Sequence, residues 1–110
     1  MNNDTLFQVQ DQVVLISGGS RGIGRAIAEG FAKRGARVVI TGRDENTLKI
    51  TASEIAGAAP VSHRVCDVAD RPGIERTVAS VKEEHGRIDV LINVAGVNRR
   101  KQALQLTEDD

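Results

Sequence analysis

The chain has 110 residues, which is the length of one small domain. Fifteen lysine and arginine residues balance fifteen aspartate and glutamate residues, so no net charge draws the chain to nucleic acid or to a membrane surface. The single cysteine, Cys66, excludes an internal disulfide and a zinc site built from several thiolates. No apolar run is long enough to cross a membrane and no signal-peptide pattern is present, so we expect a cytoplasmic protein.

Short apolar runs rich in β-branched residues occur three times along the chain. Such runs, bounded by glycine and polar residues, are typical of strands that are buried on both faces of a parallel sheet. The runs that predict strands lie at residues 13–16, 38–40 and 90–92, and a weaker alternation of apolar and polar residues predicts a further strand at residues 61–65.

Between these runs the apolar residues recur at helical spacing. The pattern predicts helices over residues 22–34, around residues 48–55, and from a cap at Asp70 to the residue before Gly86. Strands and helices therefore alternate with short connections, which predicts parallel βαβ units with right-handed crossovers. We expect an α/β fold with a Rossmann-type, doubly wound parallel sheet.

The last residues resemble the start of another helix, because Thr107 is followed three positions later by Asp110. A parallel sheet of four strands needs helices on both faces, and the pattern supplies only three. We therefore expect residues 1–110 to be the N-terminal β-α-β-α-β-α-β portion of a longer, truncated domain. The alternative is a complete chain that ends in a polar tail.

A glycine-rich turn, residues 17–24, separates the first predicted strand from the first predicted helix. Glycines let the backbone turn sharply and approach a ligand closely. The free N–H groups and the dipole of the helix N-terminus favour negative charge. No Gly-Lys-Ser/Thr sequence follows, which excludes a P-loop. The turn therefore indicates a phosphate-binding site, against the alternative of a tight turn that binds nothing.

The spacing of these glycines, Gly-x-x-x-Gly-x-Gly, resembles that of the short-chain dehydrogenase/reductase family. Ser17 stands where the family usually has threonine. Residues 67–68 match its Asp-Val motif, whose aspartate hydrogen-bonds adenine, and residues 93–96 match its Asn-Asn-Ala-Gly motif with Val94 in place of the second asparagine. The resemblance implies a cofactor site formed by Gly18, Ser20, Arg21, Gly22, Ile23, Gly24, Arg43, Asp67, Val68, Asn93, Ala95 and Gly96.

The end of the second predicted strand bears on the choice of cofactor. In Rossmann folds an acidic residue here binds the ribose 2′-hydroxyl of NAD, whereas a nearby arginine suits the 2′-phosphate of NADP. Gly42 occupies the position of that acid and Arg43 follows it. Arg21, inside the glycine turn, adds a second positive charge. We therefore expect NADP(H) rather than NAD(H).

The resemblance also implies hydride transfer between the nicotinamide and a carbonyl or alcohol substrate, by a tyrosine, a lysine four residues later, a serine and an asparagine. The sequence contains no tyrosine, so no residue of this chain is assigned a catalytic role. A basic cluster at residues 98–101 is similar to that of sugar-acid dehydrogenases of the family, such as gluconate 5-dehydrogenase, with 3-oxoacyl-acyl-carrier-protein reductases as close rivals. One arginine of the cluster would then pair with a substrate carboxylate. Simple solvation is the alternative.

Two functions follow from these patterns. The first is the N-terminal fragment of an oxidoreductase, whose family members are usually homodimers or homotetramers. The second is a non-catalytic nucleotide-binding or interaction module that is complete at 110 residues.

The remaining candidates have structural interpretations. His63 and His85 lie far apart in the sequence without a metal-ligand cluster, and Cys66 is interpreted as a packed small side chain. Asp89 is interpreted as a turn or ion-pair residue, and residues 82–84 as a solvated helix face.

Overall fold

The structure is a computed structural model that describes residues 9–55, 57, 59–67 and 69–94. In this part of the chain four strands form one parallel sheet in the spatial order β3-β2-β1-β4. The strands are β1 (Val13–Ser17), β2 (Arg37–Gly42), β3 (Ser62–Val65) and β4 (Val90–Asn93). The predicted α/β fold with a parallel sheet is confirmed.

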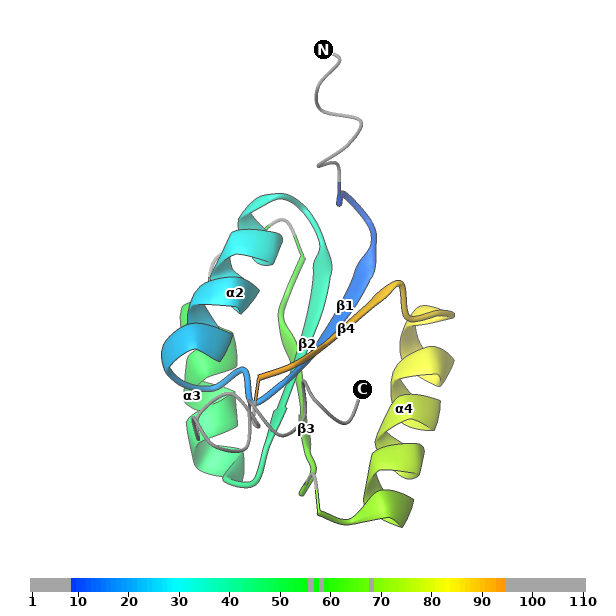
Figure 1. Ribbon diagram of the computed structural model, residues 1–110. Helices are drawn as coiled ribbons and strands as arrows, with labels where there is room; N and C mark the ends of the chain where they lie inside the picture. The colour runs from blue at the N-terminus through cyan, green and yellow to red at the C-terminus, as the bar shows by residue number, and fades with distance from the viewer. Residues whose placement is uncertain (1–8, 56, 58, 68, 95–110) are drawn as a thin grey trace, which may run out of the picture.

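Helices cover both faces of this sheet (Figure 1). They are α2 (Gly22–Lys33), α3 (Glu45–Glu54) and α4 (Arg71–His85). Figure 1 shows α2 and α3 on one face and α4 on the other. All three predicted helices are present, although Arg34 and Ile55 follow their helices as C-terminal caps.

The core is divided by the sheet into two clusters, because successive side chains of a strand point to opposite faces. Val14 and Ile16 of β1 pack on the side of α2 and α3, together with Leu48. Val13 and Leu15 pack on the side of α4, where they join Val39 and Val81. The four apolar side chains of β1 are all buried, as predicted for a strand covered on both faces.

The start of α4 differs in one respect from the prediction. Asp70 occupies the N-cap position, but its carboxylate accepts no hydrogen bond from the first turn of the helix. It lies 3.7 Å from the Arg76 guanidinium instead. The helix ends as expected at Gly86, whose φ of 88° is a left-handed conformation that glycine adopts without steric cost.

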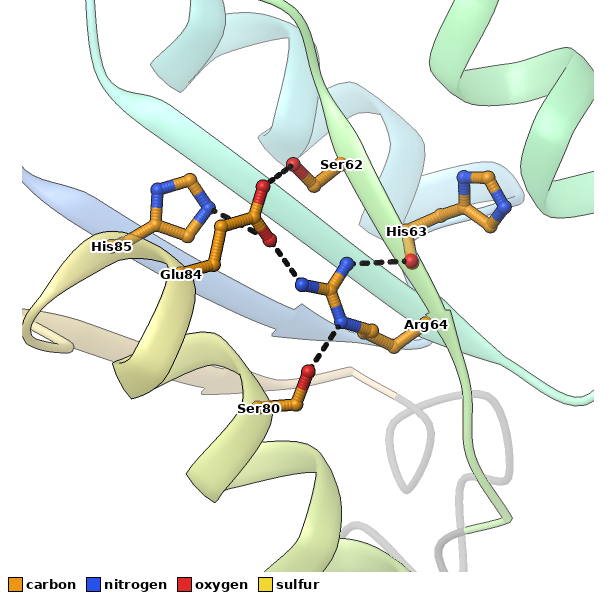
Figure 2. Close-up of polar contacts among 6 residues, drawn as sticks. All are labelled: Ser62, His63, Arg64, Ser80, Glu84 and His85. Carbon is orange, nitrogen blue, oxygen red and sulfur yellow. Dashed lines mark hydrogen bonds and ion pairs between the residues drawn. The ribbon is translucent and has the colours of Figure 1, made fainter.

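Strand β3 is joined to α4 by a polar network (Figure 2). The Arg64 guanidinium pairs with Glu84, donates to the Ser80 hydroxyl at 3.0 Å and donates to the His63 carbonyl at 2.9 Å. The hydrogen bond and charge of Arg64 lower the pKa of Glu84. Residues 82–84 are all exposed, so the predicted solvated helix face is confirmed. The pairing of Glu84 with Arg64 was not predicted, because the sequence does not show that β3 packs beside this helix.

A second polar contact closes the amino end of the sheet. The Asp89 carboxylate accepts hydrogen bonds from the Val13 N–H and from Arg87, both at 2.8 Å. These two bonds lower the pKa of Asp89. Arg87 also donates to the Asp11 carbonyl at 3.3 Å. The interpretation of Asp89 as an ion-pair residue is confirmed.

Candidate functional site

The segments that follow the four strands begin at the same edge of the sheet. Ser17 is in register with Thr41 of β2 and with Asn93 of β4, and Gly42 is in register with Val65 of β3. All four strands run in the same direction, so this is their carboxyl edge. In open α/β sheets ligands bind at this edge, where the order of the strands reverses. Here the reversal falls between β1 and β4.

The glycine-rich turn is packed tightly against the first turn of α2. Gly18 has a φ of 84°, which glycine adopts readily and other residues rarely do. A Cβ atom at Gly24 would overlap the Gly18 carbonyl oxygen, and that oxygen belongs to the backbone and cannot move aside cheaply. These two glycines are therefore required by the fold of the turn itself.

Thr51 of α3 holds this turn in place, which the sequence did not show. Its hydroxyl, in a residue that is almost fully buried, donates to the Ser20 carbonyl at 3.1 Å. In the sequence Thr51 appears only as one member of an apolar helix face. A hydroxyl at a buried helical position was the one available signal, because such a group needs a hydrogen-bond partner.

The N-terminus of α2 is open. Its N-cap residue, Arg21, makes no side-chain cap, and the first turn contains no acidic residue. The first N–H groups of a helix lack partners within the helix and attract anions. Among the described residues a Cβ atom at Gly22 would meet no neighbour within 4 Å, and Ile23 beside it is 56% exposed. This end of the helix therefore fits a ligand that is both anionic and partly apolar.

Two arginine residues, Arg21 and Arg43, lie near this turn. A Cβ atom at Gly42 would lie 3.6 Å from the Ser20 hydroxyl, which places the end of β2 beside the glycine turn. Arg21 and Arg43 flank these two positions, both are exposed, and neither forms an ion pair with a residue that the structure describes. The pair is therefore available to a ligand phosphate.

Asp67 and Asn93 complete the described part of the predicted site. Asp67 follows β3, is exposed, and accepts a hydrogen bond from the Ala69 N–H at 2.9 Å. Asn93 ends β4 and is also exposed. The other predicted contacts, Val68, Ala95, Gly96 and the basic cluster 98–101, lie outside the described residues.

A hollow of about 160 Å³ lies at the same edge on the α4 side of the sheet. Asn93 and the half-buried Cys66 contribute to its wall, so Cys66 is only partly the packed side chain that was expected. Ser17 contributes as well, and its hydroxyl oxygen is buried without a partner in the described structure. The full lining is Leu15, Ser17, Thr41, Cys66, Ile74, Thr77, Val78, Leu91 and Asn93.

A wider hollow of about 720 Å³ lies between α3 and β3. It contains no residue of the glycine turn, and its lining includes Lys49, Pro60 and His63. Its size alone does not make it the functional site, because the convergent polar groups described above lie elsewhere.

Within residues 9–94, apart from the gaps at 56, 58 and 68, no group of three or more His, Cys, Asp or Glu side chains is placed to hold a metal ion. In the same residues no helix is long and apolar enough to span a membrane.

An open helix N-terminus after a glycine turn, at the carboxyl edge of a parallel sheet, is the arrangement in which α/β proteins of the Rossmann type bind dinucleotides. The family model described as short chain dehydrogenase matches residues 12–110. The chain therefore belongs to the short-chain dehydrogenase family of oxidoreductases.

Three relatives illustrate this membership. The chain is 43% identical to short-chain dehydrogenase/reductase 3 of Homo sapiens, over 87% of this chain and 32% of the relative. It is 36% identical to gluconate 5-dehydrogenase of Gluconobacter oxydans, over 100% of this chain and 43% of the relative. It is 35% identical to 3-oxoacyl-[acyl-carrier-protein] reductase of Mus musculus, over 91% of this chain and 42% of the relative. The chain thus spans 32–43% of the length of these relatives.

Solved structures agree with this assignment. A short-chain type dehydrogenase/reductase from Mycobacterium marinum superposes with a TM-score of 0.77 at 32% identity, over 83% of this chain and 37% of that one. L-sorbose reductase from Gluconobacter frateurii, complexed with NADPH and L-sorbose, superposes with a TM-score of 0.72 at 38% identity. The superposition covers 76% of this chain and 32% of the reductase. The resemblance inferred from the three motifs is confirmed at the level of the family.

Proposed function

We propose that this chain is the cofactor-binding part of an NADP(H)-dependent oxidoreductase that transfers hydride between the nicotinamide and a carbonyl or alcohol. The observation that carries the choice of cofactor is the pair Arg21 and Arg43 beside Gly42, where an acidic residue would favour NAD. The L-sorbose reductase structure, which holds NADPH, supports the same choice.

Each described residue of the site has a binding role in this proposal. The glycine turn and the open N-terminus of α2 hold the pyrophosphate, because they present N–H groups and leave space for close approach. Arg21 and Arg43 bind the 2′-phosphate, and Asp67 binds the adenine. Asn93 lies beside the nicotinamide half of the cofactor. The nicotinamide, when bound, supplies or accepts the hydride.

Acid–base catalysis is not assigned to this chain, because its sequence contains no tyrosine. We propose that the catalytic groups belong to the remaining part of a longer parent protein, which is a homodimer or homotetramer. The short span of this chain along its relatives is compatible with that proposal.

For the substrate we propose a sugar acid, whose carboxylate would pair with an arginine of residues 98–101. Gluconate 5-dehydrogenase among the relatives supports a sugar-derived substrate. A turnover screen of the parent enzyme tests this proposal. Equal rates with sugar acids and with neutral ketones of similar size would contradict it.

The cofactor proposal is tested by binding of two small probes, adenosine 2′,5′-bisphosphate and 5′-AMP, to the 110-residue chain. Their dissociation constants differ only through the 2′-phosphate. We expect Arg43→Ala to weaken binding of the bisphosphate about ten- to a hundredfold, because a hydrogen bond to a charged group is lost. Binding of 5′-AMP should change by less than about twofold.

Arg34→Ala is the matched control, because Arg34 caps the other end of α2 and donates to the Gly30 carbonyl at 3.1 Å. It removes one arginine from the same helix without touching the glycine turn. If the ratio of the two dissociation constants is the same in Arg43→Ala as in the unmodified chain, the 2′-phosphate assignment is wrong.

A further inference from the structure

Helix α3 begins immediately beside the proposed 2′-phosphate site, and its N-terminus is already occupied. Asp44 caps it, accepting hydrogen bonds from the Asn46 N–H at 3.0 Å and the Thr47 N–H at 3.4 Å. The Thr47 hydroxyl donates to the second carboxylate oxygen at 3.0 Å. Whereas the N-terminus of α2 is open to an anion, that of α3 carries an anion of its own.

This carboxylate belongs to the same surface as the two arginines. Asp44 directly follows Arg43, and the end of β2 lies beside the glycine turn, where a Gly42 Cβ atom would be 3.6 Å from the Ser20 hydroxyl. The hydrogen bonds from Thr47 lower the pKa of Asp44, and the positive charge of Arg21 lowers it further. Asp44 is therefore ionised at neutral pH and reduces the positive charge that a ligand meets here.

Asp44 is poorly placed to act as the acid that binds a ribose 2′-hydroxyl. It stands two positions beyond Gly42, the usual place of that acid. Three donors of α3 already share its two oxygens and hold the carboxylate against its own helix. Its effect on a bound cofactor is consequently one of charge, exerted over a distance.

We propose that Asp44 is a specificity-determining residue that weakens the preference for a 2′-phosphate created by Arg21 and Arg43. The inference rests on the proposed function, since it concerns the same site. A phosphate dianion is repelled by the fixed carboxylate, whereas an uncharged 2′-hydroxyl is not. In this proposal the preference of the site for NADP(H) over NAD(H) is reduced, and the site still binds NAD(H).

The test measures the dissociation constants of adenosine 2′,5′-bisphosphate and 5′-AMP for Asp44→Asn in the 110-residue chain. Asparagine caps helices about as well as aspartate, so the variant removes the charge and keeps the cap. We expect binding of the bisphosphate to tighten about three- to tenfold, and binding of 5′-AMP to change by less than about twofold. The gain should shrink in about 0.5 M NaCl, because salt screens exposed charges.

Two further variants separate charge from structure. Asp44→Ser also retains a capping oxygen and should give the same shift as Asp44→Asn. Glu83→Gln removes one negative charge from an exposed position of α4 and should leave both dissociation constants unchanged. Helical circular dichroism verifies that α3 is intact in each variant.

The outcomes distinguish this inference from the function on which it rests. If Arg43→Ala lowers the affinity for the bisphosphate but Asp44→Asn does not raise it, the role of Asp44 is wrong and the cofactor proposal stands. If neither variant alters the ratio of the two constants, both proposals fail. Equal tightening for both probes, or the same gain in Glu83→Gln, would show a general effect of net charge and overturn the role of Asp44.

Discussion

The two ends of the sheet differ in how their charged groups are used. At the amino end Asp89 binds the Val13 N–H and Arg87, and Arg87 reaches the Asp11 carbonyl. At the carboxyl end Arg21 and Arg43 form no ion pair with any residue in the described part of the chain. The amino end therefore uses its charges to hold the fold, whereas Arg21 and Arg43 at the carboxyl end have no such use within the described residues.

The direction of the chain explains this difference. Every strand is parallel, so each helix that follows a strand begins near the carboxyl edge and directs its positive N-terminal end there. Asp44 neutralises the start of α3, whereas the start of α2 has neither a cap nor an acidic residue. The difference between the two helices favours the open N-terminus of α2, and not the edge as a whole, as the proposed anion site.

The largest effect is expected from Gly24→Ala at the carboxyl end. The added Cβ atom would overlap the Gly18 carbonyl, so we expect unfolding free energy to fall by about 1–3 kcal/mol and dinucleotide binding to be lost. Urea denaturation and titration with NADPH measure the two effects.

Gly30→Ala is the control in the same helix, because its Cβ atom would lie no closer than 3.8 Å to Arg34. This variant should gain about 0.5–1 kcal/mol from helix propensity and bind NADPH unchanged. Equal stability of both variants would contradict the close packing of α2 on the turn.

A smaller effect, confined to stability, is expected from Asp89→Ala at the amino end. It leaves the Val13 N–H without its acceptor, and Val13 is only 2% exposed. Asp89→Asn keeps an oxygen at this position and should lose less stability. Both variants should bind adenosine 2′,5′-bisphosphate as the unmodified chain does once folded. Loss of binding in the folded Asp89→Ala protein would break the distinction between the two ends.

Acid should weaken the fold through the paired carboxylates. The pKa values of Asp89 and Glu84 are lowered in the folded chain, so the unfolded chain binds more protons as the pH falls. Their stabilisation is therefore complete above the unfolded pKa values and is lost progressively below about pH 5.

Urea midpoints measured between about pH 7 and pH 3 follow this loss. The double variant Asp89→Asn/Glu84→Gln should show a shallower decline, to which Asp44 still contributes because its pKa is lowered too. A decline as steep as that of the unmodified chain would show that these pairs do not govern acid stability.

The smallest effect is expected from Glu84→Gln alone. The Arg64–Glu84 pair joins β3 to α4, but the glutamate side chain is 45% exposed, so water screens the interaction. We expect a loss of about 0.5 kcal/mol, which urea denaturation measures. Glu83→Gln on the same helix should give no loss. If it matches Glu84→Gln, the network in Figure 2 does not stabilise the edge strand.

Much of the fold and of the site was predictable from the sequence, because the signals are local. Apolar runs and helical spacing depend on neighbouring residues, and they indicated every strand and helix that the structure describes. The glycine spacing and the residues after each strand were also sufficient to place Arg21, Arg43, Asp67 and Asn93 at one edge, since parallel βαβ topology brings the carboxyl ends of strands together.

Contacts between elements distant in the sequence were not predictable in this way. Thr51 meets Ser20 across 31 positions and Arg64 meets Glu84 across 20, and each contact depends on how a helix is rotated against the sheet.

The order of the elements, the glycine turn and the family of this protein can all be inferred from its amino-acid sequence. Which of the charged side chains pair with one another in the described part of the chain is visible only once the chain is folded. The structure shows that Asp89 and Glu84 are used within the fold, and that Asp44 caps a helix beside two arginines that form no ion pair with a described residue. The reason is physical: a charge is identified by its residue, but its role depends on the groups that packing brings within reach.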